Sequence, residues 1–339
     1  MDPVTRPADA QAAATPTTDP APARTPAPAR TARARAWLRA VAIAACLPYL
    51  TLKTAWLTGS RTGIPEGSVL LDHPTAIAVA NAVTVLMDGS VIVLALLLTR
   101  PWGTRVRPWL LTVPMWTATG LLAPIMTGYP LQLAAGLFGG SHGTDSTAGS
   151  AEPFLDDWVF AVVYGGFILQ GLALGALFLL YTRDRWGSLW QGTVGGLPAS
   201  AATRGVRWCA VLGAVAAVFP AAVHLAWAGG ATTGLGASGP AGFRLLEGLR
   251  AAFAVVAVVC ALVLAFRAAP RLRLGPVLAG AWVATAAWTA WGGWMLINSL
   301  LPAGGESRTA VVTLTYAVGM ISGLLLTAVT VAVLTRRRV

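Results

Sequence analysis

Hydrophobic residues dominate eight long runs of the chain, and short segments rich in polar residues, Gly or Pro separate these runs. A helix needs roughly 20 apolar residues to cross the hydrocarbon core of a bilayer, and each run is about that long. The pattern therefore predicts an all-α integral membrane protein. Its eight transmembrane helices are expected at residues 37–57, 75–98, 109–128, 158–181, 206–228, 245–266, 276–299 and 310–334.

The segments outside these runs have compositions of their own. Residues 1–35 are rich in Ala, Pro and Thr and contain no apolar run, so we expect a disordered cytoplasmic tail. The first run is then an uncleaved signal anchor. The loop at 129–157 is the longest of the predicted outer segments and is either a lid or a tether. Within it, Leu131 to Phe138 is a candidate for a short interfacial helix.

The eight runs form two sets of four that resemble each other in sequence. At the ends of the first and fifth runs, Trp, Gly, Thr and Gly recur at the same offsets, as Trp56, Gly59, Thr62 and Gly63 and as Trp227, Gly230, Thr233 and Gly234. Further along, the residues Arg105, Arg107, Trp116 and Thr119 recur as Arg271, Arg273, Trp282 and Thr285, and Tyr164 and Gly171 as Tyr316 and Gly323. We therefore predict two tandem four-helix repeats, at 36–190 and 204–339. Four spans per repeat give both repeats the same orientation.

Charge supports the same topology. Only 11% of the residues are charged, whereas a soluble domain carries roughly 25%. The net charge is +11, and the arginines gather before the first run and after each even-numbered run, which predicts that both termini are cytoplasmic. This placement indicates contact with anionic membrane lipid and argues against nucleic-acid binding. Abundant Ala, Arg and Gly with a single Lys are typical of a GC-rich bacterial gene, so we expect a bacterial cytoplasmic membrane.

Several kinds of chemistry find no support in the sequence. The three cysteines lie within hydrophobic runs and form no C-x-x-C pair, and there are only three histidines. No H-E-x-x-H, G-x-S-x-G or phosphate-loop motif occurs. We therefore predict no metal site, no cofactor and no catalytic residue, and we consider an enzyme less favoured than a binding protein.

Five charged or titratable residues lie well inside the predicted spans, away from their ends: Lys53, Asp88, His224, Glu247 and Arg250. Each costs at least about 2.5–3.5 kcal/mol at the centre of a bilayer, so each is a candidate ligand-binding residue. Asp88 is either a proton-coupling or cation site, or a neutral acid that bonds a neighbouring helix. Lys53 and His224 each stand three residues before a matched Trp. Lys53 either binds a ligand or snorkels to the headgroups.

Glu247 and Arg250 lie one turn apart on one face of the sixth run, where they would neutralise each other and where His224 could join them. This cluster is either a structural ion pair or part of a pocket open to the outer face. In the seventh run, Trp288 and Trp291 lie deeper than an interfacial aromatic belt requires. With Asn298 and Trp227 they are candidates for lining a pocket for a flat, cationic or isoprenoid ligand, and helix packing is the alternative.

The segment His224-Leu-Ala-Trp227-Ala-Gly-Gly230 resembles a motif of an uncharacterised family of bacterial polytopic membrane proteins. In that motif a His, a Trp three residues later and a Gly pair end the first helix of a four-helix unit. In the first repeat Lys53 replaces the His, and Thr58-Gly59 replaces the Gly pair. No activity is assigned to the family, so the resemblance implies architecture only.

Three functional hypotheses follow. The first is a small-molecule or lipid carrier with an outward-facing polar pocket, which the parallel repeat and the polar residues favour. The second is a non-catalytic accessory subunit, whose protein partner the sequence does not indicate. The third is a membrane enzyme acting on a lipid or isoprenoid, with His224 and Glu247 as an acid/base pair.

Overall fold

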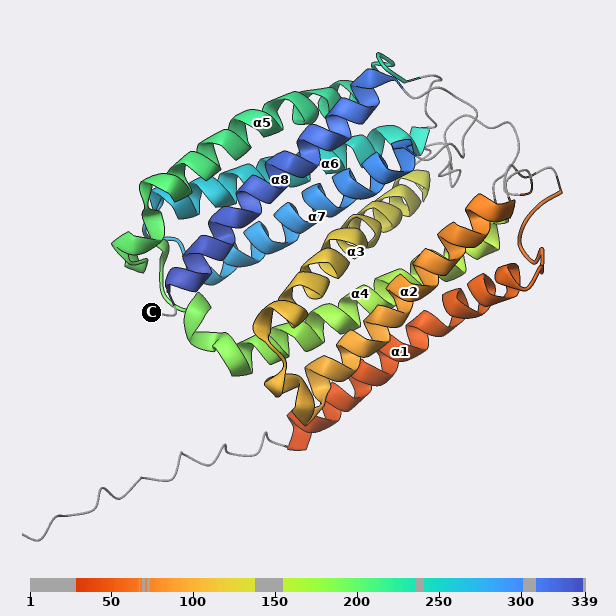
Figure 1. The fold of residues 1–339 in the computed structure, drawn as a ribbon, viewed down its shortest axis with the longest axis horizontal. Coiled ribbons are helices and arrows are strands. Elements are labelled where there is room, and N and C mark those ends of the chain that lie inside the picture. The colour runs from red at the N-terminus through yellow and green to blue at the C-terminus, as the bar shows by residue number, and fades with distance from the viewer. Residues whose placement is uncertain are drawn as a thin grey trace, which may run out of the picture.

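The computed structural model describes residues 29–66, 68, 71, 74–137, 155–235, 241–300 and 309–337. Eight helices of 25–30 residues make up most of this part of the chain (Figure 1). They are α1 (Ala29–Leu57), α2 (Pro74–Thr99), α3 (Pro108–Leu137), α4 (Asp157–Trp186), α5 (Arg204–Ala228), α6 (Ala241–Phe266), α7 (Leu274–Leu300) and α8 (Ala310–Arg336). Short 3₁₀ turns lie in the connections, at η2 (Pro101–Arg105), η3 (Gly187–Trp190), η4 (Val194–Gly196) and η5 (Ala199–Ala202).

The prediction of an all-α protein is confirmed for the described residues. Seven of the long helices, all but α7, are long and apolar enough to cross a membrane, judged by length and composition. Helix α7 has 27 residues and no charged side chain, but its four Trp and four Gly lower its mean hydropathy. The chain is thus a multi-pass helical membrane protein by these criteria, and the eighth span remains a prediction.

Two predicted boundaries are wrong. Helix α1 begins at Ala29, so residues 29–35 are helical although they were expected to belong to the disordered tail. The reason is local, because Ala and Arg alternate there and both favour helices. Helix α3 runs without a break to Leu137, so the segment from Leu131 continues α3 and is not a separate interfacial helix. Residues 1–28 of the tail and 138–154 of the long loop lie outside the described residues.

Each set of four helices has the same order of neighbours. Helix α1 packs against α2 and α4, and α3 packs against α4; likewise α5 packs against α6 and α8, and α7 packs against α8. Figure 1 shows the two sets side by side, with α3 and α7 where they meet. The first described helix begins, and the last one ends, at the same end of the bundle. Helix α3 is thus the main bridge from the first set to the second.

Small residues allow close helix packing in the second set. Ala257, Ala261 and Ala265 on α6 and Ala281 and Ala284 on α7 are at most 1% exposed. Alanine at such positions lets two helix backbones approach closely, which stabilises helix pairs in a bilayer through dispersion contacts.

The connection between the two sets is held by arginines from the end of α8. Arg337 donates to the carbonyl oxygens of Leu189 (2.6 Å) and Gln191 (2.7 Å), and Arg336 donates to that of Ser200 (3.0 Å). Some arginines of the predicted cytoplasmic end therefore bind backbone carbonyls and join distant parts of the chain. Their position still agrees with the predicted orientation, which remains a prediction.

Helices α3 and α7 meet through two reciprocal hydrogen bonds. The indole of Trp116 on α3 donates to the hydroxyl of Thr285 on α7 (3.4 Å), and the indole of Trp282 on α7 donates to the hydroxyl of Thr119 on α3 (3.3 Å). Trp116 and Thr119 are the residues whose sequence counterparts are Trp282 and Thr285. We call this contact the α3–α7 seam. Each helix donates one Trp hydrogen bond to a Thr of the other and accepts the equivalent bond in return, as two halves related by a twofold axis would.

Gly120 lies at the centre of the seam, where a Cβ would collide with the backbone of Ala286 and lie 2.8 Å from the Cβ of Ala290. We expect Gly120→Ala to lower the free energy of unfolding by about 1–3 kcal/mol relative to Gly175→Ala, because the helices must move apart. Gly175 lies within α4 and has no atom within 4 Å of its added Cβ, so it controls for helix propensity. Denaturation in mixed micelles measures the difference. Equal stability of the two variants would contradict the close approach.

Candidate functional site

The matched Trp-Gly-Thr-Gly segments form the same local structure at the ends of α1 and α5. Gly230 has φ = +98°, and the amide of Ala231 donates back to the carbonyl of Ala226 (2.9 Å). Gly59 has φ = +93° and is followed by the same six-residue bond, from Ser60 to Ala55 (2.9 Å). A left-handed residue with these back-bonds is the Schellman cap, and Gly takes that conformation without steric cost.

A tryptophan fastens the loop that follows each cap. The indole of Trp227 donates to the carbonyl of Thr233 (3.0 Å), and the indole of Trp56 donates to the carbonyl of Thr62 (2.8 Å). Both bonds run from the last turn of the helix to the residue six positions later. They hold the tryptophan ring against the helix end and so fix the position of the residue one turn earlier, which is His224 in the second set.

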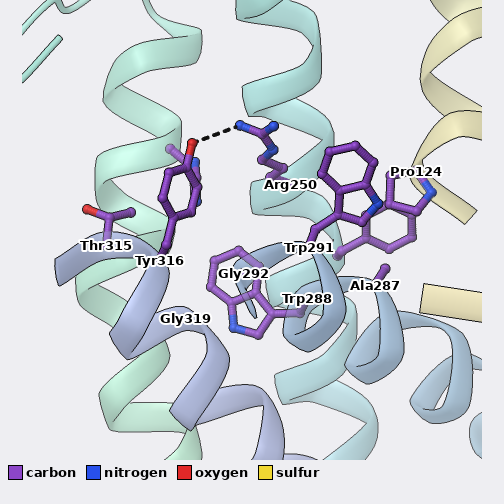
Figure 2. Close-up of a pocket in the computed structure, with 11 residues that line it drawn as sticks. Pro124, Arg250, Ala287, Trp288, Trp291, Gly292, Thr315, Tyr316 and Gly319 are labelled. Carbon is purple, nitrogen blue, oxygen red and sulfur yellow. Dashed lines mark hydrogen bonds between the residues drawn. The ribbon is translucent and has the colours of Figure 1, made fainter. Parts of the chain in front are cut away.

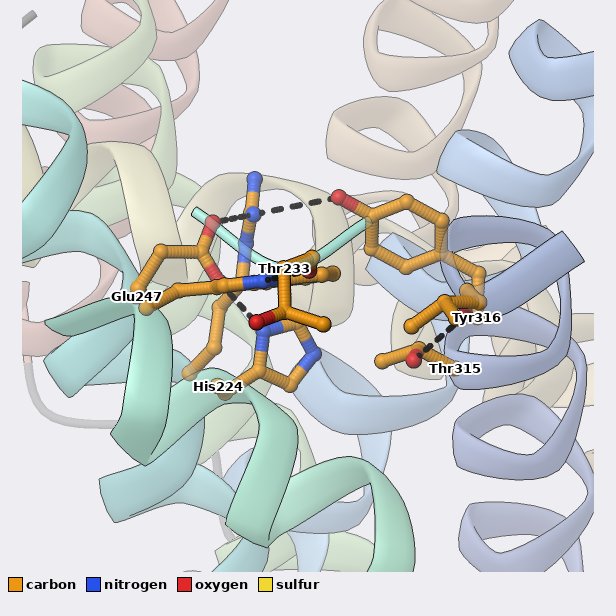
Figure 3. Close-up of polar contacts among 8 residues, drawn as sticks. His224, Thr233, Glu247, Thr315 and Tyr316 are labelled. Atoms are coloured by element: carbon orange, nitrogen blue, oxygen red, sulfur yellow. Dashed lines mark hydrogen bonds and ion pairs between the residues drawn. The ribbon is translucent and has the colours of Figure 1, made fainter. Parts of the chain in front are cut away.

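His224, Glu247 and Arg250 form one connected cluster between α5 and α6 (Figure 3). Nδ1 of His224 is bonded to Oε2 of Glu247, and Arg250 donates to Oε1 of the same carboxylate. Arg250 also donates to the hydroxyl of Tyr316 on α8 (3.4 Å). The side chain of Glu247 is 0% exposed, so the two partners replace the water that a carboxylate would otherwise need.

These bonds decide which nitrogen of His224 remains available. A carboxylate only accepts hydrogen bonds, so Nδ1 carries the proton and Nε2 carries the lone pair in the neutral ring. In the described part of the chain Nε2 forms no hydrogen bond, and His224 lines a pocket. The protein therefore presents a histidine nitrogen that is oriented by a carboxylate and is free to accept a proton or a hydrogen bond.

Aromatic rings surround His224 on three sides. The centroid of its ring lies 5.4 Å from that of Trp227, 5.5 Å from that of Trp288 and 6.0 Å from that of Tyr316. Trp288 is fixed by its indole, which donates to the hydroxyl of Ser322 on α8 (2.9 Å). The imidazole is thus held in one orientation by packing as well as by Glu247.

The pocket beside this cluster is bounded by α3, α5, α6, α7 and α8 (Figure 2), and its cavity volume is about 20 Å³. Arg250 lies between two rings that line it, 5.8 Å from the centroid of Trp291 and 5.9 Å from that of Tyr316. The indole of Trp291 donates to the carbonyl of Leu121 on α3 (3.1 Å), so the first set of helices helps to form the wall. This volume admits about one water molecule, so a larger ligand would enter only if the lining side chains moved.

The structure brings some of the predicted residues together and leaves others apart. Around the pocket lie His224, Arg250, Trp288 and Trp291, with Glu247 and Trp227 bonded or packed behind them. Asn298 does not line the pocket, because its amide donates to the carbonyl of Trp294 on its own helix (2.8 Å). Two further candidates, Lys53 and Asp88, belong to the first set of helices.

Lys53 is partly buried between α1 and α2. Its ammonium donates to Oδ1 of Asn81 (2.8 Å) and lies over the rings of Tyr49 (5.1 Å to the centroid) and Trp56 (4.7 Å). The side-chain amide of Asn81 and the two aromatic rings together offset part of the desolvation cost of this ammonium group. Asn81 precedes Glu247 by the same number of residues as Arg105 precedes Arg271, so Lys53 and Asn81 occupy the places of His224 and Glu247.

Asp88 is buried between α2 and α4, away from the pocket. Its Oδ1 accepts a hydrogen bond from the amide of Gln170 on α4 (2.9 Å). Oδ2 of Asp88 and Oε1 of Gln170 have no partner among the described residues. The expected bond from Asp88 to a neighbouring helix is thus present.

The sequence did not single out Tyr316, Ser322, Asn81 or Gln170 as members of these clusters. Tyr316 was recognised in the sequence only as the residue that matches Tyr164, and that match indicated a structural role. The others are single polar residues within apolar runs. Nothing in a run shows which neighbouring helix will face such a residue.

Comparison of the chain with protein-family models, with curated proteins and with solved structures finds no match. The resemblance carried by the His224 to Gly230 segment therefore remains a prediction. Among the described residues, no group of three or more His, Cys, Asp and Glu side chains could hold a metal ion.

Proposed function

We propose that the protein crosses the membrane eight times, as two four-helix repeats of the same orientation, and binds a small molecule in the pocket of the second repeat. Support for the repeats comes from matched local structures: the two Gly caps, the two Trp to Thr bonds and the reciprocal bonds of the α3–α7 seam. Shared membrane composition does not account for equivalent residues forming equivalent bonds. A pseudo-twofold axis along the membrane normal relates the repeats in this proposal.

The surroundings of α7 support its role as the eighth span. It packs against α3, α6 and α8, and Trp288 is only 5% exposed. A helix surrounded by other helices contacts little lipid, so its mean hydropathy need not reach that of a lipid-facing span. In this proposal both termini are cytoplasmic, which the positions of the arginines support, and the pocket faces the opposite side of the membrane.

One observation above all supports a binding function, namely the free Nε2 of His224 beside a pocket. Keeping Glu247 fully buried requires that both His224 and Arg250 hold it, which costs stability compared with apolar packing. A purely structural cluster has no need of an open cavity next to it. The pocket lies beside the seam and is lined mainly by the second repeat, with Pro124 of α3 on one side, so we favour a protein that takes its ligand from the outer face. Transport through the membrane would require the α3–α7 seam to open.

A thermal-shift screen of small molecules on the purified protein tests the proposal. A ligand at about 100 times its Kd should stabilise the wild type by about 2.7 kcal/mol. We expect Trp291→Ala and Arg250→Gln to remove this shift, and Lys53→Gln to retain it because Lys53 lies outside the pocket. If no ligand is found, or if the shift survives both pocket substitutions, the proposal is wrong. Stoichiometric co-purification of another protein would then favour the accessory-subunit hypothesis, and uptake into proteoliposomes separates a carrier from a receptor.

A second candidate function is a membrane enzyme on a lipid or isoprenoid substrate. The observation that favours it is the hydrogen bond between His224 and Glu247, which is the arrangement by which a carboxylate orients a general base. Turnover that is lost in Glu247→Gln and kept in Lys53→Gln would favour this candidate over simple binding.

A further inference from the structure

We propose that Asp88 and Gln170 form a proton-binding site between α2 and α4, in which Asp88 is a neutral carboxylic acid with its proton on Oδ2. This site lies away from the pocket and does not rest on the proposed binding function. Three observations support it: two buried oxygen atoms without described partners, the lack of a described counter-charge, and the different residues at the matching positions of the second set of helices.

Two buried oxygen atoms are left without partners where α2 meets α4. Asp88 is 4% exposed and Gln170 is 1% exposed. Nε2 of Gln170 donates to Oδ1 of Asp88 (2.9 Å), whereas Oδ2 of Asp88 and Oε1 of Gln170 have no partner among the described residues. If Asp88 is ionised, both of these atoms are acceptors and neither can satisfy the other. A buried oxygen without a hydrogen bond is costly, and here there are two.

A single proton satisfies both oxygen atoms. On Oδ2 the proton makes Asp88 a donor, and the acceptor is Oε1, which shares its carbon atom with the nitrogen that already donates to Oδ1. The acid and the amide are then joined by two parallel hydrogen bonds, from N–H to Oδ1 and from O–H to Oε1. The O–H bond forms with a proton from solvent, and its cleavage returns that proton to solvent, so no other reactant takes part.

No described cation pairs with Asp88. Cys46 and Tyr49 on α1 are close enough to interact with it electrostatically, but the thiol donates to a carbonyl of its own helix and the hydroxyl bonds a threonine of α2. Lys53 bonds Asn81, two turns before Asp88 on α2. Helix α3 and the middle of α4 carry no charged side chain. A carboxylate would therefore be neither paired nor hydrated here, and burial favours the neutral acid.

The second set of helices packs without such a pair. By the same offsets as the sequence matches described above, Asp88 and Gln170 correspond to Ala254 and Ser322, on α6 and α8, which also pack against each other. Ala254 is 1% exposed, and the hydroxyl of Ser322 accepts the indole hydrogen bond of Trp288. Packing of two helices in these places thus does not require an acid and an amide, so we assign the pair a role beyond packing.

Infrared spectroscopy of the purified protein detects the proton directly, because the carbonyl band of a protonated carboxyl group lies apart from that of a carboxylate. Exposed Asp and Glu side chains, whose pKa is about 4, are ionised by about pH 6. We expect the wild type to retain the band of one protonated acid at this pH. The band should shift when aspartate is labelled with carbon-13, disappear in Asp88→Asn, and shift in Gln170→Leu because the O–H loses its acceptor. Glu247→Gln should keep the band, because Glu247 is paired as a carboxylate.

The pH dependence of unfolding measures what the proton contributes. The amide introduced by Asp88→Asn can make both hydrogen bonds to Gln170 without a proton, so this variant should be about as stable as the wild type at about pH 5. The native wild type holds one proton more than its unfolded state. Its unfolding constant should therefore rise by about tenfold per pH unit between about pH 5 and pH 6, relative to that of Asp88→Asn. The contact between α2 and α4 is thus strongest while the proton is bound.

A wild type without the aspartate band at about pH 6 overturns the inference. If its unfolding then depends on sodium concentration and Asp88→Asn removes this dependence, a cation rather than a proton lies between the two oxygen atoms. A band that survives Asp88→Asn, or that Gln170→Leu leaves unshifted, also overturns the inference. The labelled wild-type spectrum needs no variant, so it does not depend on the folding of any substituted protein. Ligand binding in the pocket is tested separately by the thermal-shift screen.

Discussion

Replacing Glu247 with leucine is expected to lower the free energy of unfolding by about 3–5 kcal/mol. Glu247 is fully buried and is the acceptor for both His224 and Arg250. Its loss leaves the guanidinium of Arg250 within the helix bundle with no described counter-charge, next to the hydroxyl of Tyr316 and the ring of Trp291. Unfolding by denaturing detergent in mixed micelles, followed by the fluorescence of the tryptophans, measures the change.

Two further variants test the physical reason for this loss. The double variant Glu247→Leu with Arg250→Leu removes both charges, and we expect it to be more stable than Glu247→Leu alone, because replacing a whole buried ion pair with apolar residues is often neutral. The corresponding change in the first set of helices, Asn81→Leu, should cost about 1 kcal/mol, since Lys53 is only partly buried and can reach the interface. If the single variant were as stable as the double variant, an uncompensated charge would not be the cause.

Replacing Trp227 with alanine is expected to cost about 3–5 kcal/mol, the usual loss for a large buried aromatic side chain. Trp227 is 2% exposed, packs against His224, and bonds the loop after α5 through Thr233. The substitution thus removes the ring that packs against His224 and the hydrogen bond to Thr233 that fixes the loop. Trp227→Phe keeps most of the packing and should cost about 1 kcal/mol for the lost hydrogen bond.

The first set of four helices provides the control for this prediction. Trp56 makes the same bond, to Thr62, but its ring is partly exposed. We therefore expect Trp56→Ala to cost clearly less than Trp227→Ala in the same assay. Ligand binding should be lost in Trp227→Ala and unaffected in Trp56→Ala. Equal losses of stability in the two variants would mean that burial does not govern the effect.

Many features of the fold could be read from short stretches of sequence. All eight long helices lie where the hydrophobic runs predicted them, and the ends that differ most are the start of α1 at Ala29, the end of α3 at Leu137, the end of α4 at Trp186 and the start of α6 at Ala241. A membrane forces each span to satisfy its own backbone hydrogen bonds, so helix formation is a local property of each run. The matched Trp-Gly-Thr-Gly segments were likewise visible, because a Gly cap and a Trp to Thr bond involve residues within a few positions of each other.

The candidate site could be predicted in part. The sequence predicted Glu247 and Arg250 one turn apart on α6, and it predicted His224 at a similar depth on α5. The partners across helices were not predictable: Tyr316 for Arg250 and Gln170 for Asp88. Asn298, on the same helix as Trp291, was expected in the pocket and instead bonds its own helix. A periodic pattern gives the face of a helix on which a residue lies but not the neighbour that this face meets.

The sequence by itself determined the helical membrane class and the positions of the hydrophobic runs. It also determined the similarity between the two sets of four runs and the few ionisable residues whose burial in a bilayer is unfavourable. Only the tertiary structure decided that α3 and α7 form the seam, that His224 bonds Glu247 through Nδ1, and that a pocket lies beside Nε2. The physical reason is how far apart along the chain the interacting residues lie. Solvation by lipid acts on each segment separately, whereas the choice of neighbouring helix depends on the fit of side chains far apart in the chain.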